Sequence, residues 1–452
     1  MLHLALASLL SAPLPASEPA LRGVVLIMAD DLGWGDLGCY GHPEVRTPHL
    51  DAMAANGLLL ERSYAAAPVC SPTRGSVLTG RHPSRYGILG ANSGHLPHDE
   101  RTLSEVLDAW GWSTGFFGKW HLGTLTTELV ESNRGGPRGA AHYSPPWEHG
   151  FEAVFATEAK VPTWDPMLQP GSEEPYGTHY WTAPGVRAES NLAGDDSRVI
   201  VDRVLPFLEA SVAAERPFLA VVWLHAPHEP VVSGPSQAAP YAVEGELASK
   251  RTQYLGVVSA IDTEVGRIRG ALRALGVADE TLLWFTSDNG PEHGSGPGST
   301  GGLRGRKRDL YEGGVRVPGL LEWPAGLEAG SRSSLPTVTS DVLPTILART
   351  GFGRGADALP LDGVDLFELL RAGERASGIG FHSRGRAAWI QGAHKLVRPN
   401  EQAAWQLYDL ERDPSEANDL AAEDPERVSA LEEAWQRWRR ACLADAARLE
   451  ND

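Results

Sequence analysis

The sequence is poor in cysteine, and after its first residues it has no long apolar run. Three cysteines, Cys39, Cys70 and Cys442, occur in 452 residues, too few for a disulfide framework. No segment beyond the N-terminus approaches the roughly 18 to 20 apolar residues that cross a membrane. We therefore expect neither a disulfide-stapled protein nor a membrane span, and we interpret Cys39 and Cys442 as ordinary buried or partly buried thiols.

Basic residues are scarce relative to acidic ones. The chain has 40 Lys and Arg against 58 Asp and Glu, which gives a formal net charge of -18. Such a chain repels the phosphate backbone of nucleic acids, and no long Lys/Arg run offsets the repulsion. We predict that nucleic acid is not a partner, although basic residues that converge locally can still bind a small anion.

The N-terminal segment MLHLALASLLSAPLPASEPA is apolar and then rich in small residues. This pattern is typical of an export signal, so we predict a signal peptide over residues 1–18 and a product exported to the periplasm or secreted. No Lys or Arg precedes the apolar stretch. An ordinary N-terminal extension is therefore the alternative, and a lysosomal or cytoplasmic location stays open.

The rest of the chain alternates short apolar runs with helical patterns. Four runs predict buried strands of a parallel sheet: Val24 to Met28, Ser113 to Phe117, Phe218 to Leu224, and Thr281 to Thr286. Apolar residues at helical spacing predict helices over Thr102 to Trp110 and Arg251 to Leu275. We predict an α/β fold with a large, mostly parallel sheet sandwiched by helices.

The pattern changes after about Arg371. Ala387 to Leu396 and Trp405 to Leu410 resemble short strands, and Pro425 to about Leu443 has the pattern of an amphipathic helix. We predict a catalytic domain over residues 19–371 and a smaller C-terminal α+β domain with an antiparallel sheet over residues 372–452. Between Gly123 and about Asp196 the sequence has little periodicity and several aromatic residues, which predicts either a substrate wall or rings that pack beneath loops.

A polar cluster follows each predicted strand. Open α/β sheets bind ligands beyond the carboxyl ends of their strands, so four clusters at one edge favour a functional site. The clusters are Asp30-Asp31, Lys119-Trp120-His121, His225-Ala226-Pro227-His228 and Ser287-Asp288-Asn289-Gly290.

Two of these clusters supply only oxygen ligands. Asp30 and Asp31 pair with Asp288 and Asn289, a set that suits a hard divalent cation. We prefer calcium because side chains from two distant loops form an adaptable cage, and magnesium is the alternative. Arg74, Lys119, Lys307, His121 and His228 add charges that can balance a tetrahedral oxyanion and a leaving oxygen.

Cys70 admits three interpretations: a structural thiol, a thiolate nucleophile, or a precursor that is modified after translation. It precedes a short helical segment, Gly75 to Leu78, so helix-end amides and Arg74 can stabilise a thiolate. Cysteine-dependent phosphatases, however, space Cys and Arg further apart and need no metal cage. The plain thiolate is therefore the least favoured nucleophile.

These motifs resemble those of the sulfatase family, in the alkaline-phosphatase superfamily. Cys70-Ser71-Pro72-Thr73-Arg74 with Leu78-Thr79-Gly80 looks like the sulfatase signature Cys-x-Pro-Ser/Ala/Thr-Arg followed by Leu-Thr-Gly. Matching stretches run from about residue 22 to about residue 420. They include Ala29 to Gly33, Gly118 to Gly123, Ser287 to Gly290, and Leu303-Arg304-Gly305 with Lys307 before Tyr311 to Gly314.

The resemblance implies that a formylglycine-generating enzyme oxidises Cys70 to a formylglycine aldehyde. One hydroxyl of its hydrate attacks sulfur beside the metal, which is held by Asp30, Asp31, Cys70, Asp288 and Asn289. Arg74 and Lys119 hold the sulfate, and His228 and Lys307 stabilise or protonate the departing alcohol. His121 deprotonates the second hydroxyl, which releases sulfate. For His225 we predict a substrate contact.

The stretches Gly194 to Ser197, Leu407 to Leu410 and Asp413-Pro414 resemble carbohydrate-type members of the family, including arylsulfatases and N-acetylgalactosamine-6-sulfatases. A sulfated sugar is therefore the expected substrate. Two alternatives remain: a phosphoester or phosphonate monoester hydrolase of the same superfamily, and a non-catalytic protein that binds sulfated glycans.

Overall fold

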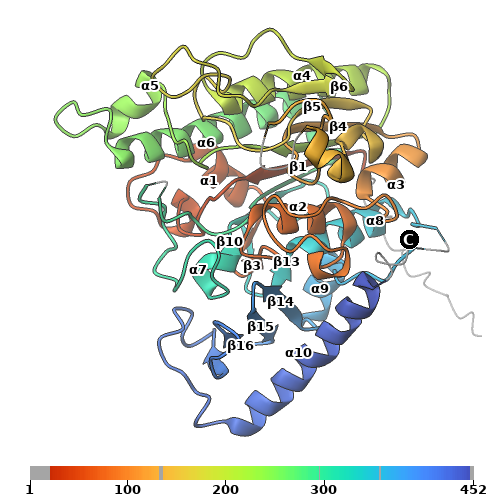
Figure 1. The fold of residues 1–452 in the computed structure, drawn as a ribbon, viewed down its shortest axis with the longest axis vertical. Helices are drawn as coiled ribbons and strands as arrows, with labels where there is room; N and C mark the ends of the chain where they lie inside the picture. The colour runs from red at the N-terminus through yellow and green to blue at the C-terminus, as the bar shows by residue number, and fades with distance from the viewer. Residues whose placement is uncertain (1–20, 132–135, 295, 356–357, 448–452) are drawn as a thin grey trace, which may run out of the picture.

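The computed structural model describes residues 21–131, 136–294, 296–355 and 358–447. The predicted signal peptide, residues 1–18, lies outside the described residues. The described chain forms a ten-stranded sheet, a three-stranded sheet and a four-stranded antiparallel sheet, with helices on both faces of the largest sheet (Figure 1). Among the described residues, no helix is long and apolar enough to cross a membrane.

The four predicted strands form the centre of the large sheet. They are β1 (Gly23–Ala29), β4 (Ser113–Lys119), β8 (Phe218–Trp223) and β9 (Thr281–Ser287). They lie in the order β9-β1-β8-β4, and each pairs in parallel with its neighbour. Every residue of these strands is buried, because helices cover both faces, and this explains why the runs are continuously apolar. The strand predictions are confirmed.

Shorter strands, which the sequence pattern did not predict, extend the sheet at both edges. On the β9 side β11 pairs antiparallel with both β9 and β2, and on the other side β5 pairs in parallel with β4. The added strands are β2 (Leu58–Leu60), β5 (Ala153–Thr157), β6 (Trp181–Ala183), β7 (Val186–Arg187), β11 (Gly319–Glu322) and β12 (Ser331–Ser333).

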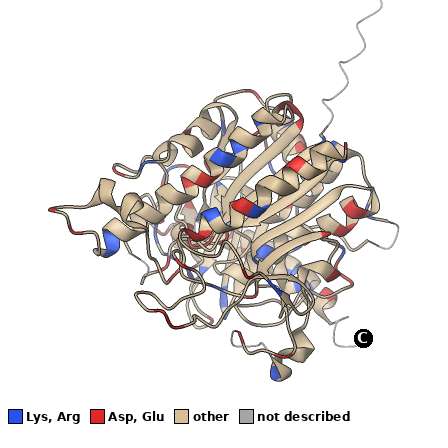
Figure 2. Ribbon diagram, turned by 90° about the horizontal axis from the view of Figure 1, so that it is seen from above, with Lys and Arg blue, Asp and Glu red and all other residues tan. Residues whose placement is uncertain are grey.

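Helices pack on the two faces of this sheet through separate apolar clusters. One face is covered by α1 (Pro48–Ala55), α4 (Asp196–Ala213) and α6 (Lys250–Ala274). The other is covered by α2 (Cys70–Thr79), α3 (Leu103–Ala109), α8 (Val342–Thr350) and α9 (Leu366–Ala372). The helices α3 and α6 confirm the two predicted helical patterns. In the view of Figure 2, basic and acidic residues are interspersed along the covering helices.

The four-stranded sheet consists of β14 (Ile379–Ser383), β15 (Arg386–Gln391), β16 (His394–Arg398) and β17 (Gln406–Asp409), all antiparallel. Its residues alternate between two cores. Trp389 packs toward α10 (Pro425–Ala446), whereas Ile390 packs toward the three-stranded sheet. That sheet comprises β10 (Arg316–Val317), β3 (Ser63–Tyr64) and β13 (Thr337–Val338). The predicted fold class is confirmed, while the boundary between residues 371 and 372 stays a prediction.

A buried ion cluster joins the two parts of the molecule. Lys395 of β16 is fully buried, and its Nζ lies 2.8 Å from Glu312 of α7 (Glu312–Val315) and 3.0 Å from Glu416. The carboxylate of Glu416 also accepts a 2.6 Å hydrogen bond from the backbone amide of Glu312. The four-stranded sheet is thus tied to the segment that ends the loop carrying Lys307.

Replacing Lys395 with methionine is expected to lower the free energy of unfolding by about 3–5 kcal/mol, because the buried Glu416 loses its cation and Glu312 keeps only Arg316, at 3.4 Å. Urea unfolding followed by tryptophan fluorescence measures this loss. The matched control is Arg371→Met, which breaks an ion pair with Glu368 whose side chains are 59% and 68% exposed. The control is expected to cost no more than about 0.5 kcal/mol. A loss below about 1 kcal/mol for Lys395→Met would contradict a structural role for this cluster.

Candidate active site

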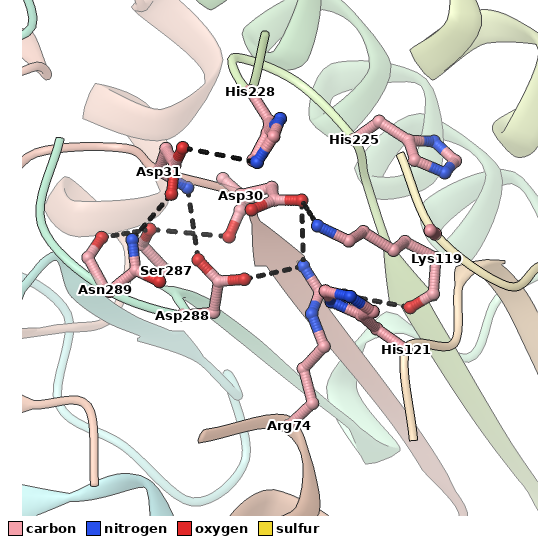
Figure 3. A network of polar contacts seen from close by, with 12 residues as sticks. Asp30, Asp31, Arg74, Lys119, His121, His225, His228, Ser287, Asp288 and Asn289 are labelled. Atoms are coloured by element: carbon pink, nitrogen blue, oxygen red, sulfur yellow. Dashed lines mark hydrogen bonds and ion pairs between the residues drawn. The ribbon is translucent and has the colours of Figure 1, made fainter. Parts of the chain in front are cut away.

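The predicted oxygen ligands meet where β1 and β9 end. Asp30 and Asp31 follow β1, and Asp288 and Asn289 follow the adjacent β9 (Figure 3). The backbone holds the two loops together, since the amide of Asp288 donates to the carbonyl of Ala29 at 3.2 Å. The amide of Asp31 donates to Oδ1 of Asp288 at 3.1 Å. All four side chains are at most 1% exposed.

The helix α2 brings Cys70 and Arg74 to the same place. The helix begins at Cys70 itself, so the prediction that Cys70 precedes a helix of Gly75 to Leu78 is wrong. The earlier start is compatible with Pro72, because the first-turn amides of a helix have no intrahelical partner and proline lacks only that donor. Arg74 follows one turn later and is fully buried, with its guanidinium 5.3 Å from the ring centroid of Trp223.

Several oxygens at this edge are suited to a cation. Single ligand atoms of Asp30, Cys70 and Asp288 all lie within 4.8 Å of one another, and the same holds for Asp30, Asp31 and His228. Oδ1 of Asp30 and Oδ1 of Asn289 are buried and have no hydrogen-bond partner in the described part of the chain. Buried oxygens of this kind are normally satisfied. The residues present therefore fit a hard divalent cation.

Three cations face the three carboxylates. Nζ of Lys119 lies 2.5 Å from Asp30, and Nζ of Lys307 lies 2.7 Å from Asp31. Arg74 lies 2.7 Å from Asp288 and 3.3 Å from Asp30. Since the three positive charges offset the three negative ones, a bound divalent ion would leave the site net positive, as binding of an anionic ester requires.

The surroundings shift the pKa values of Asp30 and Asp288 in opposite directions. Burial would raise the pKa of Asp30, but Lys119, His228, Arg74 and Lys307 hold it well below the usual value. Burial and the repulsion of Asp30 raise the pKa of Asp288. Burial also raises the pKa of the Cys70 thiol despite the nearby lysines, so the surroundings do not favour a plain thiolate.

Two predicted histidines lie at the rim of the site. Nε2 of His121 lies 2.7 Å from Oδ1 of Asn92, a residue with no recognisable sequence signal. Nε2 of His228 lies 3.7 Å from Asp31, and its Nδ1 lies 2.7 Å from the carbonyl of Glu229, which accepts a hydrogen bond from it. Burial lowers the pKa of His228 to about 4, although Asp30 and Asp31 oppose the shift.

His225 is placed differently from the prediction. Its side chain is 0% exposed, Nδ1 lies 2.8 Å from Asp196, and Nε2 lies 2.7 Å from the hydroxyl of Thr157. In Figure 3 its ring lies apart from the carboxylates. Both ring nitrogens are engaged and the residue does not line the cavity, so we no longer assign it a substrate contact. His225 follows the end of β8 and is buried there against Thr157 and Asp196.

A cavity of about 770 Å³ opens over the site and is called the Cys70 cavity below. The predicted residues that line it are Cys70, Lys119, His121, His228 and Lys307. It is also lined by residues that the sequence analysis missed, namely Asn92, Glu131, Lys160, Glu292, Arg308 and Arg384. Arg308 could have been predicted because it directly follows Lys307 in the sequence. Arg384 could not, because it lies far from every motif.

The aromatic residues between Gly123 and Asp196 fall into both predicted groups, one lining the cavity and the others packed beneath loops or in the core. Tyr176 lines the Cys70 cavity. Trp181 is 2% exposed, Trp147 packs against the main core, and Trp164 packs against Gly234. The other two cysteines lie elsewhere: Cys442 is fully buried and Cys39 is partly buried, as predicted.

A strand-end site of this composition, on a mostly parallel sheet between two helical layers, defines a hydrolase of the alkaline-phosphatase-like class. The family model described as Sulfatase matches residues 22–352. The chain belongs to the sulfatase family, whose members are sulfuric ester hydrolases.

Individual relatives agree with this assignment. The chain is 36% identical to human arylsulfatase A over 383 residues, covering 80% of this chain and 69% of that one. It is 33% identical to N-acetylgalactosamine-6-sulfatase of Canis lupus familiaris over 394 residues, covering 82% and 70%. Among solved structures, Ps i-CgsB superposes with a TM-score of 0.80 at 26% identity, covering 94% of this chain and 93% of that one.

Proposed function

We propose that this sulfatase hydrolyses a sulfate ester of a sulfated carbohydrate, with Cys70 converted to formylglycine as nucleophile beside one divalent cation. The observation that carries the proposal is the position of Cys70. It lies with Asp30 and Asp288 within 4.8 Å, and it lines the same cavity as Lys119 and Lys307. The proposed nucleophile, the proposed cation ligands and a set of positive charges thus lie together at one place.

Asp30, Asp31, Asp288 and Asn289 would hold the cation, next to the side chain of residue 70. When bound, the ion supplies positive charge for the sulfate oxygens and for the nucleophile. We favour calcium because all four protein groups are oxygen donors and come from two separate loops, whereas magnesium demands near-octahedral geometry.

The residues of the chain would divide the chemistry in two steps. Arg74 and Lys119 hold the sulfate while a hydroxyl of the formylglycine hydrate attacks sulfur. The bond between sulfur and the sugar oxygen breaks, Lys307 and His228 stabilise that oxygen, and the proton it takes balances the one that the attacking hydroxyl gives up. His121, oriented by Asn92, then removes the proton of the second hydroxyl. The aldehyde re-forms as its carbon–oxygen bond to sulfate breaks, and addition of water restores the hydrate.

Several observations support a carbohydrate substrate. One relative is named for N-acetylgalactosamine 6-sulfate, and Ps i-CgsB has been crystallised in complex with k-i-k-neocarrahexaose. A cavity of about 770 Å³ lies within the roughly 300–1,000 Å³ typical of small-molecule sites. Tyr176 offers an aromatic surface in its wall. We propose a sulfated sugar, with export by the N-terminal signal and maturation by a formylglycine-generating enzyme.

Comparison of ester substrates tests the reaction class. Purified, modified protein is expected to turn over an aryl sulfate with a kcat/KM at least about tenfold higher than that for the matching aryl phosphate, a difference of about 1.4 kcal/mol in transition-state stabilisation. Faster phosphate turnover would instead indicate a phosphoester or phosphonate monoester hydrolase. Binding of sulfated sugars without turnover would indicate a non-catalytic glycan-binding protein.

A further inference from the structure

One basic side chain of the Cys70 cavity comes from the four-stranded sheet and has no acidic partner among the residues that the structure describes. Arg384 lies between β14 and β15 and lines the cavity. Its guanidinium lies beside Gly90, which precedes the cavity-lining Ala91 and Asn92, since a Cβ atom built on Gly90 would lie 3.5 Å from its Nη2. Within the described residues, Arg384 makes no ion pair or side-chain hydrogen bond.

Three of the other cavity cations are already compensated. Lys119, Lys307 and Arg308 pair with Asp30, Asp31 and Glu292 at 2.5, 2.7 and 2.6 Å. Lys160 lines the cavity on the side of Glu229, and both also line a smaller neighbouring hollow. Arg384 and Lys160 are therefore the two cavity cations that make no ion pair within the described residues, and Arg384 is the one that comes from the four-stranded sheet.

The backbone at Arg384 is costly for an arginine. Ser383 pairs with Arg386, so Arg384 and Gly385 form a two-residue hairpin loop, and their φ angles are 47° and 79°. A loop with two positive φ angles favours Asn-Gly or Asp-Gly, because side chains other than Asn and Asp are strained there. An arginine in this position is unfavourable for the turn, and the tight loop fixes where its side chain starts.

We propose that the substrate carries a second anionic group, a carboxylate or a further sulfate, and that Arg384 binds it. The inference rests on the proposed function and adds a substrate class, namely sugars with two acidic groups. Arg74, Lys119 and Lys307 already surround the reacting site, so Arg384 acts on a remote part of the substrate. An unpaired guanidinium in a cavity of an acidic protein suits a bidentate contact with either group.

The variant Arg384→Asn separates binding from folding. Asparagine is favoured at this turn position, so the variant is expected to unfold at the same temperature as the wild type or higher. The matched control is Arg386→Gln, which removes the same charge from the same hairpin at a residue that does not line the cavity. Four substrates are compared: an aryl sulfate, a hexosamine monosulfate, a hexosamine disulfate, and the monosulfate linked to a uronic acid.

The wild type is expected to prefer the disulfate or the uronic-acid conjugate over the monosulfate. Arg384→Asn is expected to lower kcat/KM on the preferred substrate by about 10- to 100-fold, mainly through KM. For Arg384→Asn, turnover of the aryl sulfate and of the monosulfate is expected to change less than about threefold. For the control Arg386→Gln, turnover of all four substrates is expected to change less than about threefold. The preferred substrate shows which anion Arg384 binds.

Two results would overturn the role of Arg384 and leave the proposed function intact. One is a wild type that shows no preference for substrates with a second anionic group, and the other is an Arg384→Asn variant that loses activity equally on all four substrates. Failure of the modified wild type to hydrolyse any sulfate ester would overturn the proposed function as well. The aryl sulfate thus distinguishes the two failures.

Discussion

Replacing Cys70 with serine is expected to lower steady-state kcat on an aryl sulfate by on the order of 10³-fold or more. The two side chains have nearly the same shape, and residue 70 is 2% exposed, so the fold should tolerate the change. Serine has one hydroxyl, which can take the sulfo group but cannot expel it through re-formation of an aldehyde. The variant should therefore stop after one turnover.

Intact-protein mass spectrometry after incubation with substrate measures this arrest. Cys70→Ser is expected to gain the mass of one sulfo group, whereas Cys70→Ala, which has no nucleophile, gains none. Cys39→Ser serves as the control, since Cys39 is a partly buried thiol outside the Cys70 cavity, and it should keep wild-type turnover. Full activity of Cys70→Ala would contradict the assigned nucleophile.

Removal of divalent cations is expected to abolish turnover and to lower thermal stability. A ligand that binds only the folded state stabilises it by RT ln(1 + [L]/Kd), which is about 2.7 kcal/mol at a concentration 100 times Kd. Calcium should therefore raise the melting temperature of chelator-treated protein in a concentration-dependent way. The buried, unpartnered oxygens of Asp30 and Asn289 would gain a partner on binding.

The variant Asp31→Asn tests the location of this cation independently of activity. It removes one carboxylate of the proposed site, so the calcium-dependent rise in melting temperature should disappear. Asp279→Asn, a change at an exposed residue in the turn before β9, should retain the full rise. An equal calcium response in wild type and Asp31→Asn would place the cation elsewhere.

The central fold could be predicted because its signals are local. Val24 to Met28 and the three similar runs are continuously apolar, and buried parallel strands require that pattern. Their polar successors, such as Asp30 and Asp288, converge because parallel strands end at one edge of the sheet. The short edge strands, such as β2 and β12, have only three residues, so they depend on tertiary pairing rather than on a pattern.

The outer part of the site depends on contacts that no local pattern encodes. His225 and His228 follow the same strand, yet burial against Asp196 and Thr157 takes the first out of the cavity. Arg384 reaches the cavity from a separate sheet, which the sequence places 310 residues after Arg74. Asn92 lies in an irregular segment and is recognisable only by its hydrogen bond to His121.

The chemical state of Cys70 in active protein tests the central claim most directly. Trypsin releases the peptide Ser63 to Arg74, because Arg62 and Arg74 flank it with no Lys or Arg between them. When the protein is produced together with a formylglycine-generating enzyme, this peptide should carry the aldehyde, and specific activity across preparations should rise in proportion to the aldehyde fraction. Full sulfatase activity in protein whose peptide carries only the thiol would contradict the mechanism.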